Sequence, residues 1–164
     1  MSPQTVGVYS IPLQDAYNFA AALLQPPKFD VAASGAANYG AIGAILGHEI
    51  SHFVDRLGAD YDSTGGIRRW WTSADEIRFA ALSEPLAYQF AGYRPFPDIA
   101  IDGNRTSSEN IADLGGLAAA FDAYRGTLGD RINDAQFVHQ QDRQFFIGFA
   151  RAWRVKMREE AMRQ

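Results

Sequence analysis

Hydrophobic residues recur at steps of three and four residues between positions 38 and 57, which is the spacing of one face of a helix. The apolar positions are Ile42, Ile45, Leu46, Ile50, Phe53 and Val54. This periodicity predicts a helix that starts at Asn38 and ends near residue 57, with Gly58 as its C-terminal stop.

Three further helices are predicted downstream from periodicity and capping residues. Thr72 or Ser73 can cap a helix that runs to about residue 92, and Glu76 would complete a capping box with Ser73. The next predicted helix covers about residues 106–124. The last starts at residue 134 or 142 and continues to about residue 162.

Two short β-prone stretches lie near the N-terminus. Residues 5–9 (TVGVY) and 16–19 (AYNF) carry β-branched and aromatic side chains, and residues 10–15 (SIPLQD) can turn one stretch back on the other. The chain is therefore predicted to be α+β, mostly α, with a small N-terminal β element. Because it shows no repeat and no domain boundary, we expect a single domain over residues 1–164.

Composition narrows the classes of function. Hydrophobic residues make up 47% of the chain and charged residues 21%, as in globular proteins. A net charge of −4 without a cationic run argues against a nucleic-acid partner. Since Cys is absent, a transition-metal site would have to use histidines and carboxylates.

Membrane and export signals are not found in the sequence. No stretch approaches the ~20 apolar residues of a membrane span. Residues 1–19 lack the cationic start and apolar core of a signal peptide. We expect a cytoplasmic protein if this is the whole chain, and a periplasmic or secreted one if it is a fragment.

The stretch GHEISHFVDRLG (residues 47–58) holds two of the three histidines, four residues apart around a glutamate. Positions i and i+4 lie on one face of a helix, so His48 and His52 can aim both imidazoles at one point. A catalytic zinc ion takes three protein ligands and keeps one position open. A chance H-E-x-x-H is rare, roughly a few in a thousand. We therefore favour a site for one Zn²⁺ per chain over a helix that merely carries two polar side chains.

Two acidic residues in the same stretch fit roles around such an ion. Glu49 sits beside the first histidine, from where it can reach a water at the metal and take its proton. Asp55 follows His48 by seven residues and lies on the same helix face. It could accept the free N–H of a ligating ring and so fix the ring's tautomer.

The third ligand has to come from another helix, and spacing alone leaves it open. His139 is one option, but it lies in a polar run and is expected to be exposed. Glu109 and Asp113 are four apart, so Glu109 could bind the metal while Asp113 orients a histidine. Thr106 and Glu109 equally match a capping box, which needs no metal.

Two consecutive glycines follow this acidic pair. In the middle of a helix, Gly115 and Gly116 each cost roughly 1 kcal/mol relative to alanine. Such a cost predicts that another helix approaches closely at this point.

Together these pieces resemble the neprilysin family of zinc endopeptidases, which includes endothelin-converting enzymes and bacterial oligopeptidases. The resemblance implies a thermolysin-like zincin fold, and it runs from about residue 6 to residue 153. The stretches that carry it are LLQPP (23–27), NYGAIGAILGHEISH (38–52), WWT (70–72), ENIADLGGL (109–117) and FFIGFARAW (145–153).

The resemblance also implies roles for single residues. It implies Glu49 as the general base, and Asp55 and Asp113 as the partners of the histidine rings. The implied zinc ligands are His48, His52 and Glu109.

Substrate contacts are implied as well. The family's Asn-Ala pair, which holds the substrate backbone, falls at Gly7 and Val8, so the Asn contact is missing although a strand edge could still pair with a peptide. Apolar residues are also implied to line a pocket for the substrate residue after the scissile bond, although such residues are often ordinary core. These pocket residues are Leu23, Ala44, Ile45, Ala152 and Trp153.

Other departures from the family pattern bear on activity. Lys28 stands where an aromatic residue is usual, and Phe53 and Arg56 replace small and acidic residues. The chain has no counterpart of the family's downstream histidine and arginine, which act on the transition state and the substrate carbonyl, or of its upstream helical domain. Because one lost oxyanion donor costs ~10²–10³ in turnover, we expect a weak catalyst if the chain acts alone.

The sequence thus predicts a zinc-dependent metalloendopeptidase that hydrolyses peptide bonds of oligopeptides with a zinc-activated water. The alternative is a zinc-containing, weakly active or inactive module that binds peptides or a partner chain. A metal-free helical interaction domain is a third hypothesis. A peptide substrate is the expected partner, and both a homo-oligomer and a complementing chain stay open.

Overall fold

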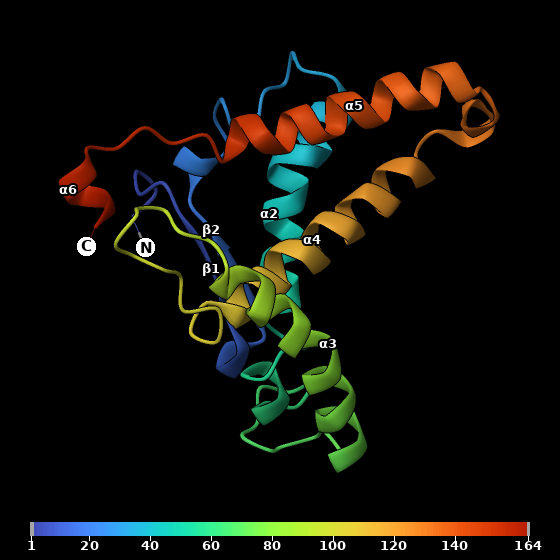
Figure 1. The fold of residues 1–164 in the computed structure, drawn as a ribbon. Helices are drawn as coiled ribbons and strands as arrows, with labels where there is room; N and C mark the ends of the chain where they lie inside the picture. The colour runs from blue at the N-terminus through green and yellow to red at the C-terminus, as the bar shows by residue number, and fades with distance from the viewer. Residues whose placement is uncertain (1, 164) are drawn as a thin grey trace.

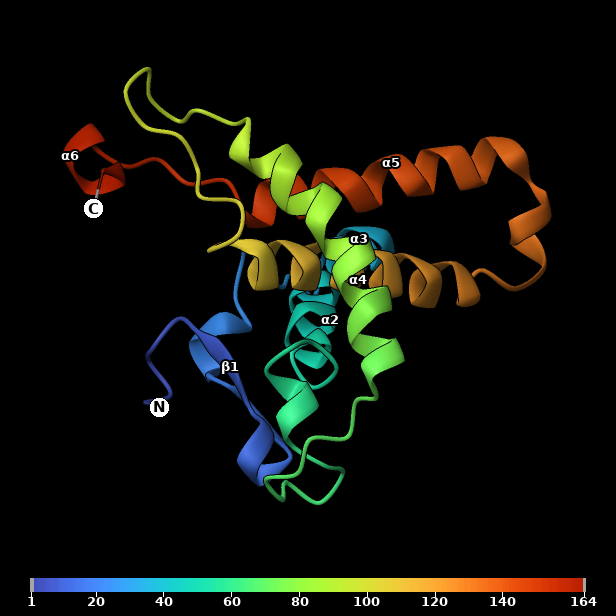
Figure 2. The same ribbon diagram turned by 60° about the horizontal axis from the view of Figure 1, so that its bottom comes forward.

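The fold is described from a computed structural model that covers residues 2–163. Its centre is a helical hairpin of α4 (Ser107–Gly126) and α5 (Ala135–Ala152), and the helical segment that ends in α2 (Ala44–Ser51) runs from α5 across α4 (Figure 1). The helix α3 (Ser73–Ala91) crosses α4 diagonally, as Figure 2 shows. This mostly helical architecture with a small sheet is the predicted fold class.

The small sheet is an antiparallel pair of β1 (Val8–Ile11) and β2 (Ala16–Phe19), and β1 packs beside α2. The prediction for the second strand is confirmed. The prediction of residues 5–9 as the first strand is wrong, because β1 begins later and extends further. The turn sets this register: Pro12–Gln14 form a turn of 3-10 helix, and Asp15 takes a left-handed conformation with φ of 46°.

The helix predicted over residues 38–57 is broken into several elements. A short helix, α1 (Gly35–Asn38), starts behind Ser34, whose hydroxyl accepts a backbone hydrogen bond of 3.2 Å. A π-helical turn, Tyr39–Gly43, then connects α1 to α2. The segment before α2 packs on α5, whereas α2 itself packs on α4.

The C-terminal end of α2 was predicted too far along the chain. The helix ends at Ser51, and the Asp55 carboxylate accepts the backbone N–H groups of Leu57 and Gly58 at 2.8 and 3.0 Å. These hydrogen bonds hold the chain in a turn where the helix would otherwise continue.

The start of α3 is as predicted, but its capping box uses other residues. The Thr72 hydroxyl accepts the N–H of Asp75 at 3.3 Å, and the Asp75 carboxylate accepts the N–H of Thr72 at 2.9 Å. Glu76 pairs with Arg69 at 2.8 Å. The predicted box between Ser73 and Glu76 is therefore wrong.

The capping box of Thr106 and Glu109, the alternative to metal binding by Glu109, is not formed at the start of α4. The hydroxyl of Thr106 donates to the carbonyl of Asp102 at 3.2 Å and makes no capping hydrogen bond. Since Glu109 is not used as a cap, its carboxylate can face α2.

The last predicted helix, which ended near residue 162, is divided into two helices in the structure. Asp134 caps α5 by accepting the N–H of Phe137 at 3.0 Å, and α5 ends at Ala152. A separate turn, α6 (Glu159–Met162), follows after a non-helical connection. The remaining short 3-10 helices are Ala21–Leu23, Gly58–Asp60 and Gly129–Asn133.

The core has two clusters around the central helices. The first lies between α1, α2, α4 and α5 and contains Ala36, Ala44, Ala120, Tyr124 and Phe145. The second lies between α2 and the N-terminal segment and contains Leu23, Ile42 and Ile45. Part of the apolar pattern along residues 42–54 faces solvent, because Leu46, Ile50 and Val54 are 38%, 52% and 57% exposed. Between residues 2 and 163, no helix is long and apolar enough to cross a membrane.

Candidate metal centre

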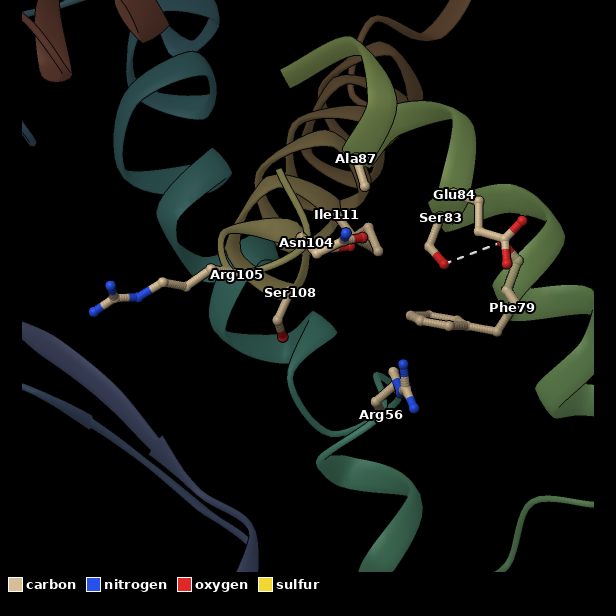
Figure 3. Close-up of a pocket in the computed structure, with 11 residues that line it drawn as sticks. Arg56, Phe79, Ser83, Glu84, Ala87, Asn104, Arg105, Ser108 and Ile111 are labelled. Carbon is tan, nitrogen blue, oxygen red and sulfur yellow. Dashed lines mark hydrogen bonds between the residues drawn. The ribbon is translucent and has the colours of Figure 1, made fainter. Parts of the chain in front are cut away.

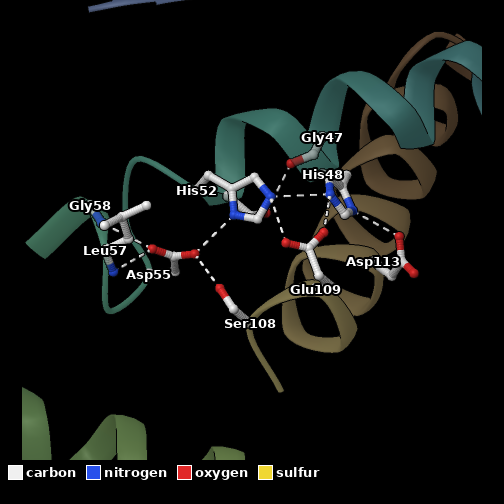
Figure 4. Close-up of polar contacts among 10 residues, drawn as sticks. Gly47, His48, His52, Asp55, Leu57, Gly58, Ser108, Glu109 and Asp113 are labelled. Carbon is white, nitrogen blue, oxygen red and sulfur yellow. Dashed lines mark hydrogen bonds and ion pairs between the residues drawn. The ribbon is translucent and has the colours of Figure 1, made fainter. Parts of the chain in front are cut away.

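Two histidine rings converge on one face of α2, as their spacing predicts. The Nε2 atoms of His48 and His52 lie 3.1 Å apart, and both side chains are largely buried (Figure 4). The ring planes are nearly perpendicular, at 87°. Both Nε2 atoms therefore point into the same space from different directions.

A carboxylate from α4 reaches the same space. One oxygen of Glu109 lies 3.2 Å from Nε2 of His48, and the other lies 3.8 Å from Nε2 of His52. All three side chains offer a ligand atom within 4.8 Å of one another, so the group could hold a metal ion. His139, the other candidate for a third ligand, is exposed on α5.

A backbone contact between α2 and α4 sets this convergence. A Cβ atom built on Gly116 would lie 2.2 Å from the backbone nitrogen of His48, and one built on Gly47 would lie 2.5 Å from the carbonyl oxygen of Gly116. The helices can approach this closely only because neither residue has a side chain. The predicted close approach is therefore found at Gly116, whereas a Cβ on Gly115 would meet only the Ser51 hydroxyl, at 3.4 Å.

A second carboxylate stands behind each histidine. Nδ1 of His48 lies 2.8 Å from Asp113, and Nδ1 of His52 lies 2.9 Å from Asp55. A carboxylate can only accept, so each ring donates its N–H through Nδ1. In the neutral rings, both Nε2 atoms then carry lone pairs that face the shared space.

Asp55 is itself held firmly. It is 3% exposed, and besides His52 it accepts the Leu57 and Gly58 amides and the Ser108 hydroxyl, which lies 2.7 Å away. Sequence reasoning missed Ser108. Its position directly before Glu109 was the only signal, and a lone serine near a helix start suggests a cap rather than a long-range contact.

The charges of the centre favour a cation. The hydrogen bond to Asp113 raises the pKa of His48, although burial opposes this rise. The hydrogen bond to Asp55 likewise raises the pKa of His52 against burial, and the charges of Glu109 and Glu49 add to it. Burial alone would raise the pKa of Asp55, but its hydrogen bonds from His52, the backbone and Ser108 outweigh burial and lower it. The centre therefore stabilises positive charge, carried either by a proton or by a metal ion.

The donor chemistry fits zinc. Two imidazole nitrogens and one carboxylate, each imidazole backed by its own carboxylate, form a ligand set that zinc takes in catalytic sites. The facing atoms are all acceptors when the rings are neutral, and such atoms repel one another unless a cation lies between them.

Glu49 lies on α2 between the two histidines in sequence. It is 7% exposed, and its charge is close enough to His52 to raise the pKa of that ring, though less than the hydrogen bond to Asp55 does. The structure therefore places a buried carboxylate beside the centre that is separate from Glu109.

The residues predicted to contact substrate lie on several elements, and four of them are only 3–4% exposed: Leu23, Ala44, Ile45 and Ala152. Gly7 directly precedes β1, which starts with Val8. Leu23 and Ile45 share one core cluster, and Ala44 belongs to the other. Ala152 ends α5 and is buried, whereas Trp153 is 43% exposed.

A cavity of about 400 Å³ lies away from these residues, between α3 and the start of α4 (Figure 3). Phe79 and Ala87 line it from α3, and Arg56 lies at its lower end. Ser108 lines it as well, so this cavity ends at the residue that supports Asp55. The metal-binding group itself is not part of its wall.

Comparison with known proteins gives a consistent answer. A family model described as peptidase family M13 matches residues 8–164. The chain is 41% identical to "Neprilysin-3" of Drosophila melanogaster over 159 residues, covering 93% of this chain and 20% of that protein. It is 33% identical to human "Endothelin-converting enzyme-like 1", covering 99% of this chain and 21% of that protein.

Solved structures agree with the sequence relatives. The zinc metalloprotease Zmp1 of Mycobacterium tuberculosis in its open state superimposes with a TM-score of 0.88 at 42% identity, covering 98% of this chain and 26% of that one. PepO of Lactobacillus rhamnosis gives a TM-score of 0.79 at 38% identity, covering 93% of this chain and 23% of that one. The chain thus spans about a fifth of the length of the curated relatives it matches. On the family match and these relatives together, the chain is a member of peptidase family M13, the family of neprilysin-like metallopeptidases.

Proposed function

We propose that this chain carries the catalytic centre of a zinc metalloendopeptidase that cleaves peptide bonds of oligopeptides. The observation that carries the proposal is the convergence of the two Nε2 atoms and the Glu109 carboxylate, each ring being held from behind by an aspartate. Membership of a metallopeptidase family supports the same conclusion.

The proposed zinc ligands are His48, His52 and Glu109. A zinc ion held there would supply Lewis-acid chemistry, polarising the scissile carbonyl and making water a better nucleophile. Asp113 and Asp55 would fix the Nδ1–H tautomers, so that each Nε2 is available as a ligand.

Glu49 is the proposed general base. Its carboxylate accepts a proton from the attacking water and delivers that proton to the leaving amine nitrogen. Its burial close to His52 suits this role, because few water molecules compete for a buried carboxylate.

The sheet offers a place for the substrate backbone. In the described part of the chain the sheet has two strands, so β1 keeps one edge that does not pair with β2. We propose that a peptide adds to this edge near Gly7 and Val8. The proposed pocket for the residue after the cleaved bond is formed by Leu23, Ala44, Ile45, Ala152 and Trp153.

The test is substitution of the proposed base. Glu49→Gln keeps the size of the side chain but removes its basicity, so zinc content measured by elemental analysis should be unchanged. Cleavage of a fluorogenic peptide should fall by at least about 10²-fold, as expected for loss of a general base. Glu160→Gln, at an exposed position of α6, is the matched control and should cleave like the parent chain. Equal cleavage by the Glu49 variant and this control would refute the assignment.

One observation favours a second candidate function. The Glu109 and Asp113 side chains are 65% and 46% exposed, so the centre is open to water, whereas catalysis gains from excluding water. A zinc-containing module that binds a peptide or a complementing chain with little turnover would tolerate this exposure. Peptide turnover by the zinc-loaded chain, compared with the chelator-treated chain, separates the two functions.

A further inference from the structure

Lys28 places a positive charge at the wall of the proposed substrate pocket. Its Nζ atom lies 2.5 Å from the carbonyl oxygen of Ala152 and 4.3 Å from the centre of the Trp153 ring. Both partners belong to the set of residues proposed to contact the substrate residue after the cleaved bond. The side chain therefore lies along this wall instead of extending freely into solvent.

The position of Lys28 relative to the proposed base follows from the helix and the core. Ile45 precedes Glu49 by one turn of α2 and lies on the same face. Leu23 and Ile45 are packed together, and Phe29, the next residue after Lys28, packs against the same cluster. The backbone next to Lys28 is thus anchored, through Phe29, to a core cluster that includes the residue one helical turn before the proposed base.

The ammonium group retains capacity for another partner. An ammonium has three N–H donors, and the carbonyl of Ala152 uses one of them. None of the ion pairs found between residues 2 and 163 includes Lys28. The Lys28 side chain is partly buried, and this burial lowers its pKa because the charged ammonium group has lost part of its hydration. An incoming carboxylate would restore the lost solvation and pair with the charge.

We propose that Lys28 makes this pocket select peptides with an acidic side chain, Asp or Glu, directly after the cleaved bond. The inference rests on the proposed function, because it specifies the substrate of the same site. Lys28 acts as a specificity-determining residue: its ammonium contacts the substrate side chain and takes no part in proton transfer.

Lys28 also stabilises the end of α5, and this structural role has to be distinguished from selection of an acidic substrate side chain. A cation at the C-terminus of a helix stabilises the helix dipole and the last carbonyl groups, and Ala152 ends α5. If Lys28 only caps α5, its removal would lower stability without changing ligand preference. The test therefore needs a readout of ligand charge as well as one of stability.

The experiment measures binding of two matched ligands to the zinc-loaded chain by calorimetry. Both are N-phosphoryl amino-acid amides, whose phosphoryl group coordinates zinc, made from either Glu-NH₂ or Gln-NH₂. The two ligands differ only in the charge of the side chain next to the zinc-binding group. The variants are Lys28→Met, which removes the charge, and Lys28→Arg, which retains it. Lys156→Met, at the exposed second lysine of the chain, is the matched control.

We expect the parent chain to bind the Glu ligand about tenfold more tightly than the Gln ligand, as for a charge-assisted hydrogen bond. This ratio should fall to about one in Lys28→Met, persist in Lys28→Arg and Lys156→Met, and shrink with added salt. A parent chain that binds both ligands equally, or a ratio unchanged in Lys28→Met, would overturn the inference and leave the proposed function intact. Failure of both ligands to bind the zinc-loaded parent chain would instead refute the accessible zinc centre, and the inference with it. If Lys28→Met does not fold, the ratio of the two ligand affinities in the parent chain, and its dependence on salt, still test the inference.

Discussion

The crossing of α2 and α4 and the packing of α3 against α4 show two ways in which the chain joins its helices. At the first, the backbones of Gly47 and Gly116 touch, and no side chain fits between them. At the second, α3 has 19 residues and buries only Ala87, while a cavity of about 400 Å³ lies between its middle part and the start of α4. The metal-binding group lies at the first junction and not at the second. Ligand positions are therefore fixed where helix separation is fixed by backbone contact.

The largest effect is expected when the crossing is forced apart. Gly116→Ala places a methyl group 2.2 Å from the backbone nitrogen of His48, so α4 must move away from α2. We expect the free energy of unfolding to fall by more than about 3 kcal/mol, beyond the usual cost of overpacking, with loss of tight zinc binding. Denaturant unfolding and zinc titration measure the two effects.

The adjacent glycine provides the control for this prediction. Gly115→Ala meets only the Ser51 hydroxyl, at 3.4 Å, and gains up to about 1 kcal/mol of helix propensity. It should leave zinc binding unchanged and the stability equal or higher. If the two variants behave alike, backbone contact does not set the position of Glu109.

Removal of the α4 ligand is the next largest effect. Glu109→Gln removes the negative charge that lies near both Nε2 atoms. Zinc affinity should fall by more than about 100-fold, because loss of a residue that only hydrogen-bonds to a ligand already costs up to about 100-fold. Competition with a chromophoric chelator measures the affinity. Asp122→Asn, at an exposed position of the same helix, should bind zinc like the parent chain. A similar affinity in both variants would mean that the third ligand is another residue.

The two supporting aspartates should differ from each other. Asp113→Asn and Asp55→Asn should each weaken zinc binding about 10–100-fold, because the ring tautomers are no longer fixed. Only Asp55→Asn should also lower the free energy of unfolding, by about 1–3 kcal/mol, since this buried group accepts two backbone amides and the Ser108 hydroxyl. Equal stability of the two variants would contradict the structural role given to Asp55.

The smallest effect is expected on α3. Leu82 is 79% exposed, so Leu82→Ala should change the free energy of unfolding by no more than about 0.5 kcal/mol and leave zinc affinity unchanged. Thermal unfolding and the same zinc titration check both statements. A loss of zinc binding here would show that α3 supports the centre, against the contrast drawn between the two junctions.

Much of the centre follows from the sequence, because its key spacings are local. The four-residue steps from His48 to His52 and from Glu109 to Asp113 each predict two side chains on one helix face. In the structure Glu109 and Asp113 lie on α4, whereas His48 lies on α2 and His52 is the C-cap residue that ends it. Gly116 indicated a close helix–helix approach, because glycine destabilises the middle of a helix and is expected there only where a larger side chain would not fit. Spacing could not say whether Glu109 faces the histidines or caps its own helix, since this depends on how two distant helices cross.

The errors arose where side chains compete with the backbone pattern. Periodicity continued α2 to residue 57, but Asp55 takes the amides that further helix would need. Periodicity also joined α5 to α6, although Lys28, 124 residues away from Ala152, binds the last carbonyl of α5. Such long-range hydrogen bonds leave no trace in hydrophobic spacing. The bounds of the first strand were missed for a related reason, because they depend on the turn in which Asp15 is left-handed.

The most direct test of the central claim is anomalous diffraction at the zinc absorption edge from crystals of the zinc-loaded chain. The account predicts one strong peak, about 2.0–2.2 Å from Nε2 of His48, Nε2 of His52 and a carboxylate oxygen of Glu109. A map without a peak between these three groups, or one in which zinc binds with Glu109 turned away, would contradict it.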